Sequence, residues 1–145
     1  MNTTLLYRLF GLGRFPKQVR AALEQEGMLA CDEGISGRLI TRDFKAPGKR
    51  FKFRCVGFSG AIALTRKRLI AYAYWRRLIN IPLDDPRLEQ IDMRMMSEER
   101  LELDFESALF HPDWQGRITV QLRTSKAQSI LDTLRRLGPP DRPEG

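Results

Sequence analysis

Two segments in the C-terminal third of the chain constrain the fold most, because apolar and polar residues alternate along both. Residues 101–106 read Leu-Glu-Leu-Asp-Phe-Glu, and residues 118–123 read Ile-Thr-Val-Gln-Leu-Arg. A period of two places every second side chain on the same face of a β-strand. One face of each strand is then buried and the other is wet, as is typical of antiparallel sheets. The sequence therefore predicts a sheet-based fold.

Weaker strand patterns fill the middle of the chain. They cover residues 38–45, 51–64, 69–75 and 79–83, with a less regular candidate at 88–95. Turn-forming residues separate several of them, as in Ala46-Pro47-Gly48. Gly57 and Gly60 are expected to bend or bulge the second strand. Seven short strands at close spacing favour a barrel or a sandwich.

One helix is predicted on each side of these strands. Residues 16–27 begin with Pro16 and end with Gly27, which suit the first turn and the C-terminal cap. The second helix covers about 126–137, where Ser125 and Gln128 have the spacing of a capping box. Its apolar stripe is expected to pack against the open end of the barrel. That stripe consists of Ala127, Ile130, Leu131, Leu134 and Leu137.

Length and composition fit one folded domain. The chain has 145 residues, of which 42% are apolar and 30% charged, so a core can form without a metal or a disulfide. Cys31 and Cys55 are expected to be free thiols. We recognise no signal peptide and no long apolar run, which favours a cytoplasmic protein, with peripheral membrane attachment left open. We expect an N-terminal segment at 1–34, one domain at 35–138 and a disordered tail at 139–145. Residues 1–15 are expected to dock on the domain, with membrane anchoring as the alternative.

Two short stretches carry a resemblance to a known family. Residues 63–72 read Ala-Leu-Thr-Arg-Lys-Arg-Leu-Ile-Ala-Tyr, and residues 81–83 read Ile-Pro-Leu. With the order of seven strands and one helix, they resemble bacterial pleckstrin-homology-like (PH-like) and GRAM-like domains over about residues 35–137. The resemblance implies a mainly-β (α+β) fold, a seven-stranded barrel or sandwich capped by a C-terminal helix. The helix at 16–27 departs from that pattern, and periodicity alone leaves an OB-fold or a small sandwich open.

Few residues in the sequence point to catalysis. His111 is the single histidine, and the chain has no glycine-rich phosphate loop and no nucleophile motif. His111, Cys31 and Cys55 together are fewer than the four closely spaced ligands of a structural zinc site. Glu102, Asp104 and Glu106 share the polar side of one strand and are expected to be solvated. We therefore expect no enzymatic activity, no cofactor and no metal.

Basic residues are concentrated in the first half of the chain. Residues 1–80 hold 16 Lys/Arg against 5 Asp/Glu, whereas residues 81–145 hold 9 against 13. The densest run joins the first two strands and supplies the candidate anion-binding residues, which are Lys45, Lys49, Arg50, Lys52 and Arg54. Strand alternation places Lys52 and Arg54 on one face. The resemblance implies that Lys45, Lys52 and Arg54 clasp headgroup phosphates, as basic residues do in lipid-binding PH domains. The alternative is a solvated hairpin whose charges keep the sheet soluble.

Three functions are compatible with these features. The leading prediction is a binding or assembly module that acts by protein–protein contact or self-association, through its sheet edges and N-terminal segment. The second is attachment to an anionic membrane surface through residues 45–54. The third is nucleic-acid binding, in which Trp75 beside Arg76 and Arg77 stacks on bases.

Overall fold

The structure is a computed structural model that describes residues 13–137. The predictions for residues 1–12 and for the tail at 139–145 lie outside the described residues. In chain order the elements are α2 (Lys17–Gln25), β1 (Met28–Ala46), β2 (Lys49–Thr65), β3 (Arg68–Ala73), β4 (Arg76–Pro82), the 3-10 helix η1 (Pro86–Gln90), β5 (Asp92–Ser97), β6 (Arg100–Glu106), the 3-10 helix η2 (Ser107–Leu109), β7 (Gln115–Arg123) and α3 (Ala127–Leu137).

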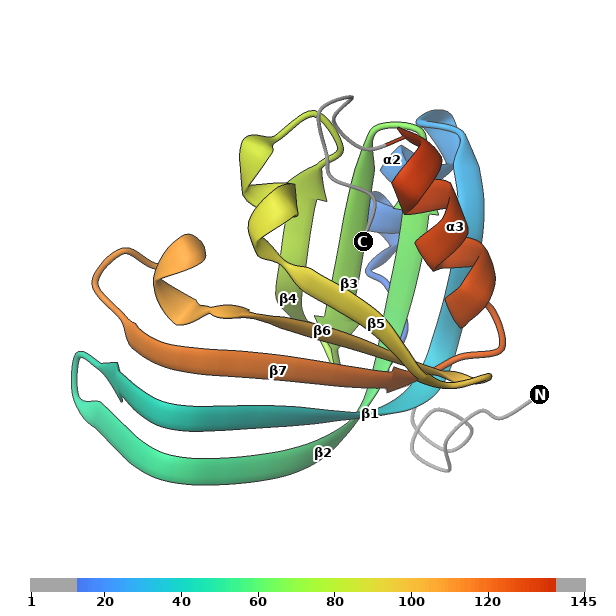
Figure 1. The fold of residues 1–145 in the computed structure, drawn as a ribbon. Helices are drawn as coiled ribbons and strands as arrows, with labels where there is room; N and C mark the ends of the chain where they lie inside the picture. The colour runs from blue at the N-terminus through green and yellow to red at the C-terminus, as the bar shows by residue number, and fades with distance from the viewer. Residues whose placement is uncertain (1–12, 138–145) are drawn as a thin grey trace.

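The seven strands form one antiparallel sheet in the order β4-β3-β2-β1-β7-β6-β5. The sheet curves strongly around β1 and β2, its two longest strands (Figure 1). Within the described residues β4 and β5 are its two ends, so the sheet does not close into a complete barrel. The prediction of a mainly-β fold with one helix before the strands and one after them is confirmed.

Strand β1 begins at Met28, earlier than its sequence pattern suggests. Register shifts between Met28 and Ala30 and between Glu33 and Ile35 break the alternation that a pattern search relies on. Gly34, with φ of 71°, lies at the second shift. This second shift lies opposite Ala61 and Gly60 of β2, so the irregularity expected near Gly60 is present, with the extra residue on β1, whereas the pairing at Gly57 is regular.

The main core lies between the inner face of the curved sheet and α3. It contains fully buried side chains from both halves of the sheet, such as Ile62, Leu64, Leu101 and Leu103. As predicted, α3 buries Ala127, Ile130, Leu131 and Leu134, whereas Leu137 is 42% exposed. The helix starts differently from the prediction. The hydroxyl of Thr124 accepts the Lys126 N–H at 3.1 Å, and the amide of Gln128 donates to Asp132 at 2.9 Å instead of closing a capping box.

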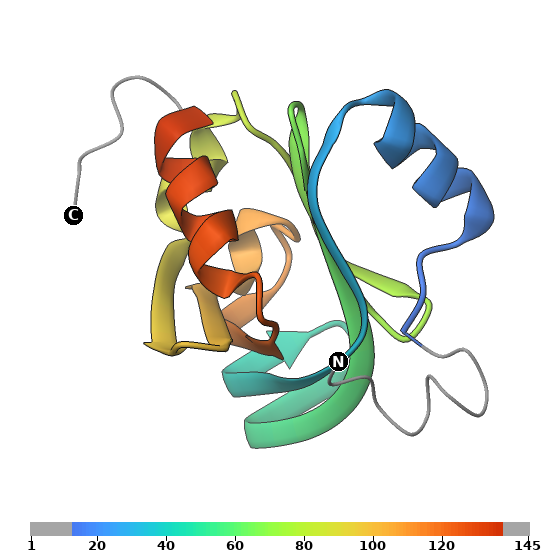
Figure 2. The same cartoon turned by 90° about the vertical axis from the view of Figure 1, so that its right-hand side faces the viewer.

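Helix α2 covers the opposite face of the sheet, so β1 and β2 are sandwiched between the two helices (Figure 2). Leu23 and Phe15 are buried against Ala61, Ala63, Ile70 and Tyr72. The rings of Phe15 and Tyr72 meet edge to face, with centroids 5.4 Å apart. The Glu33 carboxylate accepts the Phe15 N–H at 2.8 Å and pairs with Arg20. These contacts attach residues 13–25 to the sheet.

Candidate functional site

The candidate site is the far part of the β1–β2 hairpin, residues 41–57, which we call the basic arm. It contains six basic residues and one acidic residue, a net charge of +5. On one side β1 pairs with β7 as far as Lys45, which faces Gln115. On the other side β2 pairs with β3 only from Gly60 to Leu64. Among the described residues β2 is therefore an edge strand along the arm, and it forms the lower margin of the sheet in Figure 1.

Four of the five candidate residues share one face of the arm. Lys45 lies directly opposite Arg50, and Lys52 and Arg54 follow Arg50 at alternate positions. The prediction that Lys52 and Arg54 lie on the same face therefore agrees with the register. Lys49 lies on the opposite face, with Phe51 and Phe53, so the five cations do not form one flat patch.

These cations lack an acidic partner in the described part of the chain. None of the five forms an ion pair with another residue between 13 and 137. The guanidinium carbon of Arg54 lies 4.9 Å from the centroid of the Phe51 ring. All five residues are exposed to solvent.

A row of aromatic rings attaches the arm to the loop before β7. The Trp114 ring packs edge to face on Phe44 at 5.3 Å, and Phe44 stacks on Phe51 at 6.0 Å. His111 is exposed, and its ring stacks on Trp114 with centroids 3.6 Å apart. The histidine therefore belongs to a packing cluster that supports the arm.

A close approach between two backbones positions β7 against the arm. Asp43 has φ of 50° and Gly116 has φ of 104°, beside the register shift between Arg42 and Lys45. A Cβ atom on Gly116 would lie 2.6 Å from the carbonyl oxygens of Arg42 and Asp43. Only glycine fits this position without a backbone movement.

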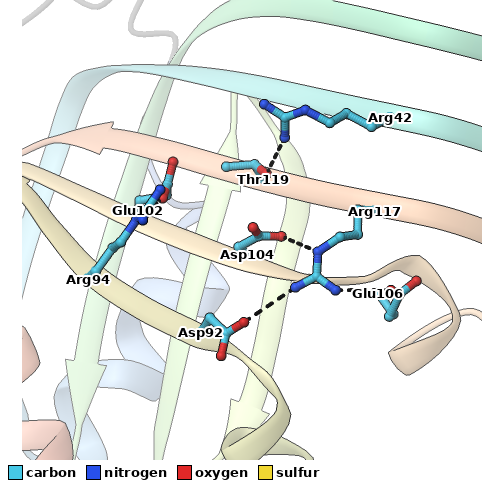
Figure 3. A network of polar contacts seen from close by, with 8 residues as sticks. All are labelled: Arg42, Asp92, Arg94, Glu102, Asp104, Glu106, Arg117 and Thr119. Carbon is cyan, nitrogen blue, oxygen red and sulfur yellow. Dashed lines mark hydrogen bonds and ion pairs between the residues drawn. The ribbon is translucent and has the colours of Figure 1, made fainter. Parts of the chain in front are cut away.

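Acidic residues lie further along the same sheet, where they pair with arginines (Figure 3). Arg117 of β7 pairs with Asp104 at 2.9 Å, with Glu106 at 3.0 Å and with Asp92 at 3.4 Å. On the same outer face Arg42 donates to the hydroxyl of Thr119 at 3.2 Å.

Glu102 corrects the expectation of a fully solvated acidic strand, because its side chain is buried. It accepts hydrogen bonds from Arg94 and from Gln121. Burial alone would raise the pKa of Glu102, but these hydrogen bonds outweigh burial and lower the pKa below its usual value. This carboxylate therefore belongs to the ion pairs that hold β5, β6 and β7 together.

Two exposed aromatic residues, Trp75 and Phe53, lie beside or on the arm, and Trp75 is near Gly57, where the arm joins the rest of the sheet. The turn between β3 and β4 contains Trp75, which is 68% exposed, followed by the exposed Arg76 and Arg77. Tyr74 fixes this turn against β2, since its N–H donates to the Ser59 carbonyl at 2.8 Å and its hydroxyl donates to the Gly57 carbonyl at 3.4 Å. On the arm itself, Phe53 is 61% exposed.

Other kinds of site find little support in residues 13–137. No group of three or more His, Cys, Asp or Glu side chains in this range has the arrangement of a metal site. The two cysteines are free, and burial raises the pKa of the Cys31 thiol. No helix in this range is long and apolar enough to span a membrane.

Comparison with known proteins adds no identity. No protein-family model matches the sequence. No curated protein matches it either.

Sequence reasoning identified the basic residues of the arm but missed the features around them. The unpaired edge of β2 and the exposure of Phe53 depend on where β3 ends, which strand patterns do not show. The sequence does not distinguish Phe53 from Phe51, because both lie between two cations and yet Phe51 is half-buried and Phe53 is exposed.

Proposed function

We propose that this chain is a non-enzymatic binding module with a PH-like fold, and that its basic arm binds an acidic segment of a protein partner. The PH-like interpretation is supported by seven antiparallel strands in one curved sheet, followed by a helix that covers the core. The function rests on one observation, which is a set of five exposed cations that, within residues 13–137, have no acidic partner and lie beside an unpaired strand edge.

The charge arrangement supports an anionic ligand. Like charges this close repel one another, since the Debye length at physiological salt is about 8 Å. An acidic ligand relieves that repulsion and is attracted to the arm before contact. Arg117 illustrates the contrast, because it lies near the same arm and is already surrounded by three carboxylates.

Two features of the arm favour a protein over a membrane as the ligand. Lys49 lies on the opposite face of the hairpin from the other four cations, whereas a membrane surface meets one side of a protein. The edge of β2 also offers backbone N–H and C=O groups, which a polypeptide can pair and a lipid surface cannot.

The N-terminal segment is a weaker candidate for the partner-binding surface than the arm. Helix α2 is packed on the sheet, so residues 17–25 are already engaged in an intramolecular contact.

Binding to an anionic membrane is the second candidate, and Phe53 favours it. An exposed aromatic ring between two cations suits the boundary between headgroups and acyl chains. Nucleic-acid binding has a weaker basis, which is the exposure of Trp75 beside Arg76 and Arg77.

One set of binding measurements separates these candidates. The full chain is titrated at low and at physiological salt against a fluorescent polyglutamate peptide, vesicles with and without phosphatidylserine, and a single-stranded oligothymidylate. The test variant is Lys52→Gln with Arg54→Gln. The control is Arg66→Gln with Lys67→Gln, which removes two exposed cations at the other end of β2.

We expect polyglutamate to bind, and the arm variant to weaken binding by about 1–2 kcal/mol, or roughly five- to thirtyfold. The control variant should bind like the unmodified chain. Equal loss in both variants would mean that net charge, and not the arm, attracts the peptide. Binding only to the anionic vesicles, or only to the oligonucleotide, would replace the protein partner by that ligand.

A further inference from the structure

The unpaired edge of β2 is long enough to accept an additional strand. Residues 49–58 have a β1 partner on one side and, among the described residues, no strand on the other. Ten residues exceed the usual strand length of about five or six. The segment contains no proline, and the β1–β2 register is regular along it. Prolines and bulges are two of the devices by which edge strands normally avoid pairing.

The end of β3 defines where an additional strand would stop. Ala73 of β3 is the last residue that pairs with β2, opposite Gly60. The next residues turn away toward β4, and Tyr74 is bonded to the carbonyls of Ser59 and Gly57. A strand added along residues 49–56 would therefore lie in line with β3 and end at this turn, beside the exposed ring of Trp75. In Figure 2 the turn protrudes beside β2 on the side that carries α2.

Side-chain alternation along the edge specifies the chemistry of the added strand. Arg50, Lys52 and Arg54 lie on one face, and Phe51 and Phe53 on the other. Residues directly opposite each other in neighbouring strands interact, and opposite charges or apolar pairs are favourable there. The matching segment is therefore extended, acidic at alternate positions and apolar or aromatic between them.

The same pairing rule disfavours a second copy of this chain at the edge. In a two-fold antiparallel pair centred on residue 53, Lys52 of one copy would face Arg54 of the other. In a pair centred on residue 52, Arg50 of one copy would face Arg54 of the other. Like charges directly opposite each other destabilise a strand pair. The occupant that fits the charges is thus an acidic segment of a different protein.

We propose that an extended acidic segment of a partner adds to the free edge of β2 as a new antiparallel or parallel strand, between the tip of the arm and the β3–β4 turn. This inference rests on the proposed function and specifies how the basic arm holds its partner. Backbone hydrogen bonds to β2 supply affinity, and the alternating cations and phenylalanines supply selectivity.

The experiment selects ligands without assuming a partner. Random ten-residue peptides displayed on phage are selected against the immobilised full chain, and enriched peptides are synthesised. Each is then made in two N-methylated forms, one methylated at odd positions and the other at even positions. In an added strand only every second N–H faces β2, so one form loses those hydrogen bonds and the other keeps them.

We expect enriched peptides to be acidic with alternating apolar residues. One methylated form should bind at least tenfold more weakly, and the other should bind almost as the parent does. The variant Lys52→Glu with Arg54→Glu should lose binding, whereas Arg66→Gln with Lys67→Gln should keep it. Sedimentation of the free chain should show a monomer.

Each other outcome overturns a defined part of the proposal. Acidic peptides that need Lys52 and Arg54 but tolerate both methylation patterns would refute strand addition and leave the proposed function standing. Peptides that are insensitive to the arm variant, or no enrichment at all, would refute both. A dimer that the arm variant dissociates would identify a second copy as the occupant.

Discussion

Replacing Leu134 by alanine tests whether α3 is an integral part of the core. Leu134 is fully buried, and it belongs to the same cluster as Leu101 and Leu103 of the sheet. The substitution removes three carbon atoms, which are worth about 2.4 kcal/mol at roughly 0.8 kcal/mol each. The cavity left behind adds to that cost, so the free energy of unfolding should fall by about 2.5–5 kcal/mol.

Leu137 provides a matched control on the same helix. It is 42% exposed, so Leu137→Ala removes the same atoms but leaves little or no cavity. Its cost should be below about 1 kcal/mol, and alanine is favourable in a helix at both positions.

Urea unfolding followed by tryptophan fluorescence and far-UV circular dichroism measures both variants. The m-value should stay unchanged, because neither substitution alters the surface exposed on unfolding. Equal costs for the two variants, or a cost below about 1 kcal/mol for Leu134→Ala, would show that α3 is peripheral and that the assignment of the core is wrong.

Two further substitutions test the polar and backbone features of the sheet. The lowered pKa of Glu102 means that its contribution to stability is present above the unfolded pKa of about 4.3 and is lost as pH falls through the lower folded pKa. In acid-side unfolding titrations Glu102→Gln should therefore show a shallower loss of stability below about pH 5 than the unmodified chain, and parallel curves would contradict this role. Gly116→Ala should cost roughly 1–3 kcal/mol and speed amide exchange in β7 and the arm, because its Cβ would meet two carbonyl oxygens at 2.6 Å. Gly48→Ala, at φ of 76° with open space around it, should cost only about 1–2 kcal/mol and leave β7 protected, so identical exchange in both variants would argue against the close approach.

The elements that sequence predicted well are those with an unbroken period. Residues 101–106 and 118–123 lie in β6 and β7, and the stripe from Ala127 to Leu134 is buried in α3. Each pattern indicates which face of its element is buried, and it can be recognised without knowing which strand lies beside it. Helix α2 was also predictable, since Pro16 and Gly27 mark its ends.

The features that sequence missed depend on neighbours in space. The first part of β1 was missed because bulges near Gly34 break its alternation. Glu102 occupies a polar position in its strand, yet Arg94 and Gln121 from the adjacent strands cover it and bury its carboxylate. The free edge of β2 results from the early end of β3 at Ala73. The sequence pattern of one strand does not indicate how long the neighbouring strand is.

The uneven charge of the chain survives folding, and the sheet order explains why. The acidic residues of β5 and β6 lie next to β7, where Arg117 pairs with three of them. Strands β1 and β2 lie on the far side of β7 from those carboxylates, and β2 has no neighbour along the arm among the described residues. A fold that mixed the charges would have placed β6 beside β2. Because these carboxylates pair with Arg94 and Arg117 within β5, β6 and β7, and β7 separates them from the arm, the positive charge of the arm remains available to a ligand. This is the physical basis on which the arm, and not the charge of the chain as a whole, is proposed as the binding site.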